Sequence, residues 1–176
     1  MDGILPLITA PGLQALTLTM RGASGHDLLA FIRRSSPPLE KLIIGTKQEE
    51  IVAECLNLLP TLTHFEICEL DCPPTIGDYF CTMLADNPSM VPNLRVLKFG
   101  QYDYTPSGQS LDLLLHCIAV RSTMLRTVHI IGGTNSQWQP RTNPRLEAAL
   151  AAGLREFLGK GVDIRIGSPE KNFLDL

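Results

Sequence analysis

A six-residue phrase recurs along this chain and constrains its fold more than any other feature. The phrase has the form L-x-x-φ-x-φ, in which φ is an apolar residue and x is any residue. Five full copies begin at Leu13, Leu39, Leu62, Leu94 and Leu125. A weaker sixth copy has Gly159 in the first slot and Val162 and Ile164 in the apolar slots. The first slots are 26, 23, 32, 31 and 34 residues apart. Such spacing predicts a solenoid, in which each unit buries its apolar face against its neighbours.

The segments between the copies have the periodicity of helices, because apolar residues recur three and four positions apart. Ser24 is placed to cap the first of these helices, and Thr46-Lys47-Gln48-Glu49 has the spacing of a capping box for the second. Ser110 is placed to cap the fourth helix, and Asn143-Pro144 to begin the fifth. The repeated order of strand and helix predicts an α/β solenoid, with short parallel strands on its concave face and helices on its convex face.

We expect residues 1–167 to form this solenoid, with about five to six repeats, and residues 168–176 to form a C-terminal tail. Residues 4–10 have the apolar pattern of the last turns of a repeat helix, so we interpret the chain as beginning inside a repeat. The first strand then lacks a complete preceding repeat to pack against. We therefore expect Leu13, Leu16 and Leu18 to have fewer neighbours than their counterparts further along.

Composition excludes several classes of partner. The net charge is −3 and the isoelectric point is about 5.8, so the chain lacks the basic surface of a nucleic-acid-binding protein. No apolar run approaches the roughly 18 residues that a membrane span needs, and the start lacks the cationic region of a signal peptide. The odd count of five cysteines favours a reduced, intracellular protein of the cytoplasm or nucleus over a disulfide scaffold.

The repeated phrase is that of leucine-rich repeats, whose usual period is roughly 20–29 residues. Its alternation with helices that end in segments such as Ile4-Leu5-Pro6-Leu7-Ile8-Thr9-Ala10-Pro11-Gly12-Leu13 resembles the C-terminal repeat region of fungal F-box-type proteins. The resemblance covers nearly all of residues 4–167. It implies an adaptor of a cullin ubiquitin ligase, in which the repeats select the protein to be ubiquitinated and no residue is catalytic. An F-box helix bundle does not fit into the ten or so residues before the first strand.

One set of residues suggests a metal site, and its spacing argues against one. His64, Cys68, Cys72 and Cys81 form the pattern H-x₃-C-x₃-C-x₈-C. Structural zinc sites more often use C-x₂-C or H-x₃₋₅-H pairs. On a strand, His64 and Cys68 share a face but lie about 13 Å apart, which is too far for one ion. Cys81 falls within a helix and is interpreted as a small core residue. We expect no metal and no other cofactor.

Nucleophilic and phosphate-binding motifs are also poorly supported. The chain has no G-x-S-x-G elbow, and Gly22-Ala23-Ser24-Gly25 is better explained as a turn and a cap. Cys117 follows His116 directly, so on a helix the two side chains point about 100° apart. Gly159-Lys160-Gly161 ends a helix, whereas a phosphate-binding loop must begin one. We therefore expect no catalytic residue, no small-molecule substrate and no enzyme activity.

The remaining candidate site is the concave face. Side chains alternate along a strand, so the residue between the last two apolar slots points away from the core. Stacking of the repeats predicts a column made of Thr17, Ile43, Glu66, Lys98, His129 and Arg165. A second column beside it is predicted to contain Ala15, Lys41, His64, Val96 and Thr127. We expect partner-binding residues among these columns, above all the first column together with Lys41 and His64. The alternative is a solvated concave face without a partner.

The loops that follow the strands suggest a second binding element, a rim along one edge of the solenoid. They lengthen towards the C-terminus, and insertions on one edge of a solenoid often line its binding face. Tyr102 and Tyr104 fall in the fourth of these loops, and Trp138 falls in the fifth. Large aromatic residues dominate many binding energies, which predicts a rim contact. The alternative is that Trp138 folds inward and closes its own loop over the core.

These observations favour a protein-recognition module, and specifically the substrate-selecting repeat region of an F-box-like ubiquitin-ligase adaptor. The partner is then a protein, without a role for nucleic acid or membrane. Two other interpretations stay open at this point. In the first, the chain is a truncated or decayed structural fragment with no retained partner. In the second, it is an enzyme, although it lacks catalytic motifs.

Overall fold

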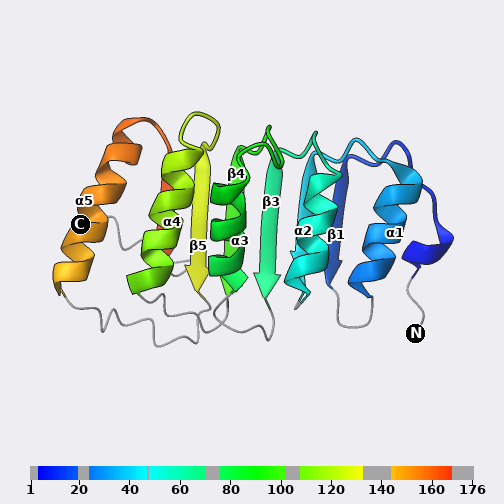
Figure 1. The fold of residues 1–176 in the computed structure, drawn as a ribbon, viewed down its shortest axis with the longest axis horizontal. Coiled ribbons are helices and arrows are strands. Elements are labelled where there is room, and N and C mark those ends of the chain that lie inside the picture. Colours follow the sequence, from blue (N-terminus) through cyan, green and yellow to red (C-terminus); the bar gives the residue numbers. More distant parts are fainter. Residues whose placement is uncertain are drawn as a thin grey trace.

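Strands and helices alternate along the chain in the computed structural model (Figure 1), which describes residues 4–19, 24–46, 48–69, 76–101, 108–132 and 144–167. The strands are β1 (Ala15–Thr19), β2 (Lys41–Gly45), β3 (His64–Glu69), β4 (Val96–Gln101), β5 (Thr127–Gly132) and β6 (Asp163–Gly167). The helices are a short 3-10 helix η1 (Leu5–Leu7), then α1 (Gly25–Ser35), α2 (Glu49–Asn57), α3 (Ile76–Asp86), α4 (Gly108–Val120) and α5 (Pro144–Gly159).

The strands form one parallel six-stranded sheet in which β1 to β6 lie side by side in the order of the sequence. Parallel neighbours require a crossover connection, and each of the helices α1 to α5 provides one. The expected α/β class, with parallel strands alternating with helices as in a leucine-rich-repeat-like solenoid, is thereby confirmed. None of the helices in the described part of the chain has both the length and the apolar character needed to cross a membrane.

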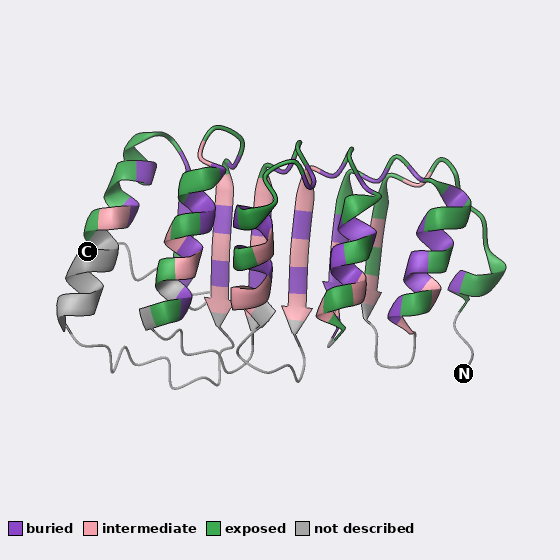
Figure 2. Ribbon diagram, viewed as in Figure 1, coloured by how far each residue is buried: buried purple, intermediate pink, exposed green. Residues whose placement is uncertain are grey.

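The apolar slots of the repeated phrase form the core between the sheet and the helices. Along β3 and β5, buried residues alternate with half-buried ones, as Figure 2 shows. The leucines in the first slot of the second to fifth copies have no exposed surface: Leu39, Leu62, Leu94 and Leu125. Each helix adds apolar residues from its inner face, so the core continues from one repeat to the next.

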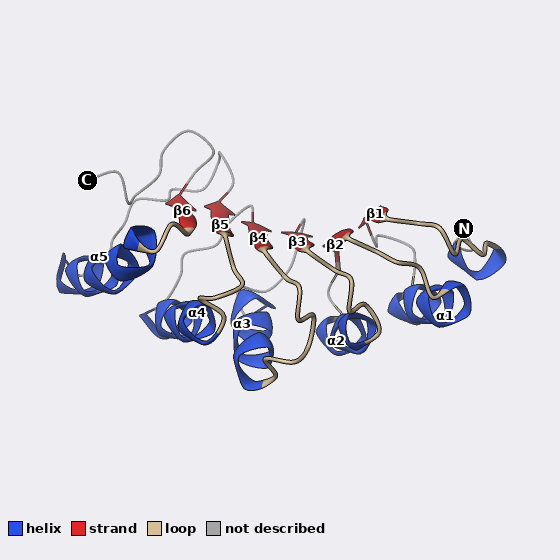
Figure 3. Ribbon diagram, turned by 90° about the horizontal axis from the view of Figure 1, so that it is seen from above, coloured by secondary structure: helices blue, strands red, loops and turns tan. Residues whose placement is uncertain are grey.

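The sheet lines the concave side of the molecule, and the helices lie together on the convex side (Figure 3). Seen from above, the helices spread over a wider arc than the strands, because a helix is about 10 Å across whereas neighbouring strands are less than about 5 Å apart. The bend leaves one face of the sheet without helices over it. The predicted concave columns lie on that face.

The sixth copy of the phrase lies two residues later than the sequence predicted. Strand pairing sets Ile164 opposite Val128 and Ile166 opposite Ile130, so Ile164 and Ile166 occupy the apolar slots. Counting back three residues from Ile164 places Gly161, rather than Gly159, in the first slot. The physical reason is that α5 extends to Gly159. The chain then turns at Gly161, whose φ of +81° is left-handed and favours glycine.

The predicted cap of α1 by Ser24 is confirmed, and Asp27 adds a second, reciprocal hydrogen bond to it. The Ser24 hydroxyl accepts a hydrogen bond from the His26 backbone N–H at 3.1 Å. The Ser24 backbone N–H donates to Asp27 Oδ2 at 3.3 Å, which completes a capping box. Pro144 is the first residue of α5, as predicted.

The capping predictions for α2 and α4 are wrong, because the side chains concerned have other partners. The N-cap of α2 is Gln48, without a capping side-chain bond, and its Oε1 accepts from the Gly25 N–H of the neighbouring helix at 2.6 Å. Thr46 Oγ1 accepts from the Gln48 N–H at 3.0 Å. Ser110 lies inside α4, and its hydroxyl donates to Asp78 Oδ2 of α3 at 2.8 Å. The bonds of Gln48 and Ser110 connect one repeat to the next.

A buried arginine makes a further connection between repeats. Arg121 follows α4 directly and is 3% exposed. Its guanidinium donates to four backbone carbonyls at and after the end of α3: Leu84 at 2.8 Å, Asn87 at 2.8 Å, Met90 at 2.7 Å and Val91 at 3.4 Å. The end of a helix leaves carbonyls without helical partners, and Arg121 satisfies several of them.

The N-terminal end of the sheet is less well covered than the rest. Leu13, Leu16 and Leu18 are only half-buried, whereas Leu42 and Ile44, paired with Leu16 and Leu18 in β2, have no exposed surface. Among the described residues, the single turn of η1 is all that lies beside α1 in the helix layer at this end (Figure 3). The predicted difference in burial is therefore confirmed, since a single turn covers less of β1 than a full helix covers of the other strands.

We expect amides of β1 to exchange with solvent through openings at least about 2 kcal/mol lower in free energy than those of β3 to β5, because local stability follows buried apolar contact. Hydrogen exchange resolved by residue measures this difference. Strand β6 is the control, since it is also an edge strand but its Ile164 and Ile166 are 2% and 3% exposed. Equal protection of β1 and β3 would contradict the expectation. If β6 opens as easily as β1, edge position rather than burial is the cause.

Candidate functional site

The two predicted columns lie in register across the concave face. Strand pairing aligns Thr17, Ile43, Glu66, Lys98, His129 and Arg165, which is the first column as predicted. The second column consists of Ala15, Lys41, His64, Val96, Thr127 and Asp163. Sequence reasoning missed Asp163, because the sixth copy was placed two residues too early. The alternation of Asp163 and Arg165 with buried isoleucines was the signal that could have identified it.

On β3, three polar side chains form a chain of hydrogen bonds along one strand. Glu66 Oε2 lies 3.2 Å from Nε2 of His64, and Glu66 Oε1 accepts from the Cys68 thiol at 3.4 Å. A carboxylate only accepts hydrogen bonds, so the histidine nitrogen is the donor. The Glu66 carboxylate thus lies between His64 and Cys68 on the strand and bonds to both.

Burial favours the uncharged state of both neighbours of Glu66. It lowers the pKa of His64, and the nearby Lys41 and Lys98 add to this effect against the opposing hydrogen bond with Glu66. Burial also raises the pKa of Cys68 to about 11, and the charge of Glu66 contributes to the rise. At neutral pH, His64 is therefore neutral and Cys68 is a protonated thiol. A protonated thiol is a poor nucleophile and a poor metal ligand.

A second polar cluster joins β5 and β6. His129 Nε2 lies 2.9 Å from Asp163 Oδ2, and Arg165 Nε lies 3.4 Å from Asp163 Oδ1. The hydrogen bond with His129 lowers the pKa of Asp163, and the charges of His129 and Arg165 lower it further. Asp163 is therefore ionised at neutral pH. Both of its oxygens are engaged by side chains of the protein itself.

Lys98 lies between these two clusters and is paired with neither. In register, it is opposite Glu66 on one side and His129 on the other, and it is half-buried. Yet Glu66 bonds along its own strand, and Asp163 bonds to His129 and Arg165. Within the described residues, the Lys98 ammonium has no carboxylate at ion-pair distance. The concave face therefore presents a cation at its centre.

The surface next to Lys98 lacks a side chain. Gly100 is two residues further along β4, and strand pairing places it between Cys68 and Ile131. A Cβ atom built on Gly100 would come no closer than 3.7 Å to another atom, the carbonyl oxygen of Ile67. No described residue therefore blocks the approach of another group to the backbone of β4 at this point. Cys68 and Ile131, both half-buried, flank the opening.

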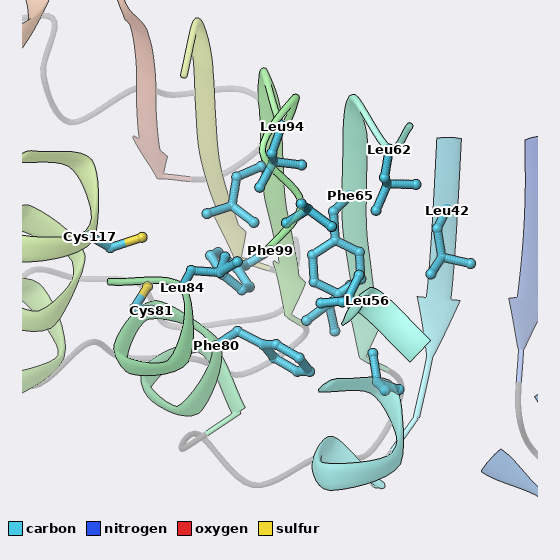
Figure 4. Packing of buried hydrophobic residues seen from close by; sticks show 14 of the residues in the cluster. Leu42, Leu56, Leu62, Phe65, Phe80, Cys81, Leu84, Leu94, Phe99 and Cys117 are labelled. Carbon is cyan, nitrogen blue, oxygen red and sulfur yellow. The ribbon is translucent and has the colours of Figure 1, made fainter. Parts of the chain in front are cut away.

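Cys81 and Cys117 belong to the core and not to the concave face. They are 3% and 0% exposed, on α3 and α4, and their sulfur atoms point toward one another (Figure 4). A hydrogen bond with Cys117, together with burial, raises the pKa of the Cys81 thiol. The interpretation of Cys81 as a core residue is confirmed. His116 is exposed while its neighbour Cys117 is buried, so the two side chains point apart as expected.

The described part of the chain contains no group of three or more His, Cys, Asp or Glu side chains placed to hold a metal ion. Cys72, a member of the candidate metal pattern, lies outside the described residues, and so do the rim residues Tyr102, Tyr104 and Trp138. Their placement stays a prediction.

Comparison of the chain with protein-family models, with curated proteins and with solved structures finds no match. In the part of the chain that the structure describes, the hydrogen bonds of His64 and His129 run to carboxylates and not to a hydroxyl.

Proposed function

We propose that this chain is a protein-recognition module of the leucine-rich-repeat type, which binds another protein along its concave face. The observation that carries the proposal is the pair of polar columns, which continue in register across six strands. Extended concave surfaces of solenoids are their usual binding surfaces. Lys98 supports the proposal further, because a half-buried cation that forms no ion pair with any described residue is available to a partner.

The finer proposal is that the module selects substrates for an F-box-like ubiquitin ligase inside the cell. It is supported by the phrase L-x-x-φ-x-φ and by its resemblance to the repeats of fungal F-box-type proteins. Recruitment of the ligase would then require an F-box helix bundle in the same protein or in an associated one. Purification of the protein from its native cells, followed by a search for a cullin adaptor, tests this part separately.

Charge reversal at Lys98 tests the proposed binding face. We expect Lys98→Glu to reduce capture of the partner by about tenfold or more, because a charge of the wrong sign at the centre of an interface costs upwards of about 1.4 kcal/mol. Partners are captured from native-cell extract on immobilised protein and quantified by mass spectrometry. Wild-type and variant chains are compared at equal loading.

The matched control is Arg33→Glu, the same reversal on α1 of the convex side, where the side chain is 63% exposed. It should retain the proteins captured by the wild type. If both variants lose them equally, the concave face is not the binding surface. Absence of any protein retained by the wild type above a folded unrelated control would support a fragment without a partner.

A further inference from the structure

We propose that the concave face recognises an extended acidic segment of the partner, with a carboxylate side chain over Lys98 and an apolar side chain over Gly100. This inference rests on the proposed function, because it names the chemistry that the same face would bind. The partner's segment would contain an acidic residue and an apolar residue two positions apart.

The charges around Lys98 favour an acidic residue. Glu66 on β3 is held by His64 and Cys68, and Asp163 on β6 is held by His129 and Arg165. Neither carboxylate lies within ion-pair distance of Lys98, and no other carboxylate among the described residues does, so its ammonium can meet a carboxylate of a partner. An anion that arrives over β4 and β5 meets Lys98 directly. It also lies on the side of Lys98 away from Glu66.

The spacing on β4 favours an extended segment. Lys98 and Gly100 are two residues apart on one strand, so they face the same side about 6.6 Å apart. An extended peptide repeats its side chains on one side with nearly the same spacing. A carboxylate over Lys98 therefore places the side chain two residues away over Gly100. No other spacing along an extended segment serves both positions.

The surroundings of Gly100 favour an apolar side chain at that second position. Its flanking residues are Ile131 and Cys68, which holds a proton at neutral pH. A protonated thiol behaves as a small hydrophobic group. The opening at Gly100 is large enough to accept a Cβ without displacing protein atoms. An aliphatic side chain placed there would bury surface against both neighbours.

The same face does not suit a nucleic acid. A phosphate backbone is bound by several cations spaced along it. Here Glu66 lies in the same column as Lys98 and Arg165, and Asp163 lies in the neighbouring column, two residues from Arg165 on β6. The chain as a whole carries a net charge of −3. A protein segment with one carboxylate matches this alternating surface better than a polyanion does.

The test selects peptides from a random dodecapeptide display library on the wild-type chain and measures binding of the enriched peptides by fluorescence polarisation. We expect enrichment of Asp or Glu two positions from an aliphatic residue.

Replacing that acid by Gln should weaken peptide binding about tenfold or more, and raising the salt concentration should weaken it further. Lys98→Glu should weaken binding to the same extent, while Arg33→Glu should leave it unchanged. A Glu-to-Lys exchange in the peptide should restore binding to Lys98→Glu.

Gly100→Val tests the second position. Valine favours strands, and the opening accepts its Cβ, so thermal melting should not fall. Filling the opening should nevertheless weaken peptide binding about tenfold, because the apolar side chain loses its place. Unchanged binding by this variant would overturn the assignment of Gly100.

The outcomes separate this inference from the proposed function. If the enriched peptides show no preference for Asp or Glu but their binding still depends on Lys98, the inference is overturned. The proposed function, recognition of a protein by the concave face, would then still stand. The inference is likewise overturned if no peptide is enriched while a whole protein is still captured in a Lys98-dependent manner, or if a second copy of the chain occupies the face. Failure of both peptide selection and protein capture would overturn both proposals.

Discussion

Replacement of Arg121 by methionine is expected to lower the free energy of unfolding by about 4 kcal/mol. Of the four carbonyls that its guanidinium satisfies at and after the end of α3, those of Leu84, Met90 and Val91 are bound in buried hydrogen bonds, and that of Asn87 in a partly buried one. Burial lowers the pKa of Arg121, which reflects the cost of placing its charge there. Methionine fills part of the volume but donates no hydrogen bond, so each buried carbonyl left unsatisfied adds its own penalty. Urea denaturation followed by circular dichroism measures the change.

Arg34 provides the matched control for this prediction. Its guanidinium also donates to backbone carbonyls of a preceding turn, those of Leu5 and Ile8 next to η1, but Arg34 is exposed. Water replaces an exposed partner, so we expect Arg34→Met to cost only about 1 kcal/mol. Arg121→Lys should fall between the two, because a lysine ammonium cannot reach four carbonyls in a fixed fork. Equal small losses for Arg121→Met and Arg34→Met would show that burial is not the cause.

The sequence was sufficient to predict the solenoid, because the repeated phrase specifies two things together. Its alternating apolar slots determine which face of each strand is buried, and its first leucine sets where each strand begins. Neighbouring strands that begin at equivalent residues pair in register, as Glu66, Lys98 and His129 do. The pattern therefore predicts the members of the first concave column on β1 to β5 correctly. Arg165 also lies in this column, although a sixth copy that begins at Gly159 would place Asp163 there.

Interactions between repeats were not predictable in the same way. Ser110 has the type and position of a cap, but its hydroxyl bonds to Asp78, which is 32 residues away in the sequence. Arg121 resembles a solvent-exposed residue at the end of a helix, yet it bonds to carbonyls more than 29 residues away. Such partners depend on the distance between adjacent helices, which no local pattern encodes.

The concave pairs show a similar limit. Sequence spacing places His64, Glu66 and Cys68 on one face, but it does not reveal that Glu66 bonds within its own strand. As a result, Lys98 forms no ion pair with any residue that the structure describes. The bonding of Glu66 within β3, and not to Lys98, is the main reason why we propose a binding role for Lys98. The architecture also separates the core, which lies on the helix side of the sheet, from the proposed binding face, which lies on the other side.

Truncation of Phe80 to alanine is expected to destabilise the protein by about 4 kcal/mol, without changing the concave columns. Phe80 lies on α3 with no exposed surface, and its ring meets Phe65 of β3 edge-on at a centroid distance of 5.4 Å (Figure 4). Removing the ring leaves a cavity between helix and sheet, and it also removes an aromatic contact worth about 1 kcal/mol beyond the area buried. Urea denaturation of Phe80→Ala measures the total loss.

A double-mutant cycle with Phe65→Leu isolates the aromatic contact, for which we expect a coupling energy of about 1 kcal/mol. Thr82→Ala is the control on the same helix, since Thr82 is exposed and its hydroxyl bonds to the backbone carbonyl of Asp78 at 2.9 Å. It should change stability by less than about 0.5 kcal/mol. Below its melting temperature, Phe80→Ala should still bind any ligand found for the concave face, because Phe80 lies on the opposite side of the sheet from Lys98. Loss of that binding in a folded Phe80→Ala variant would show that the core and the concave face are coupled through β3.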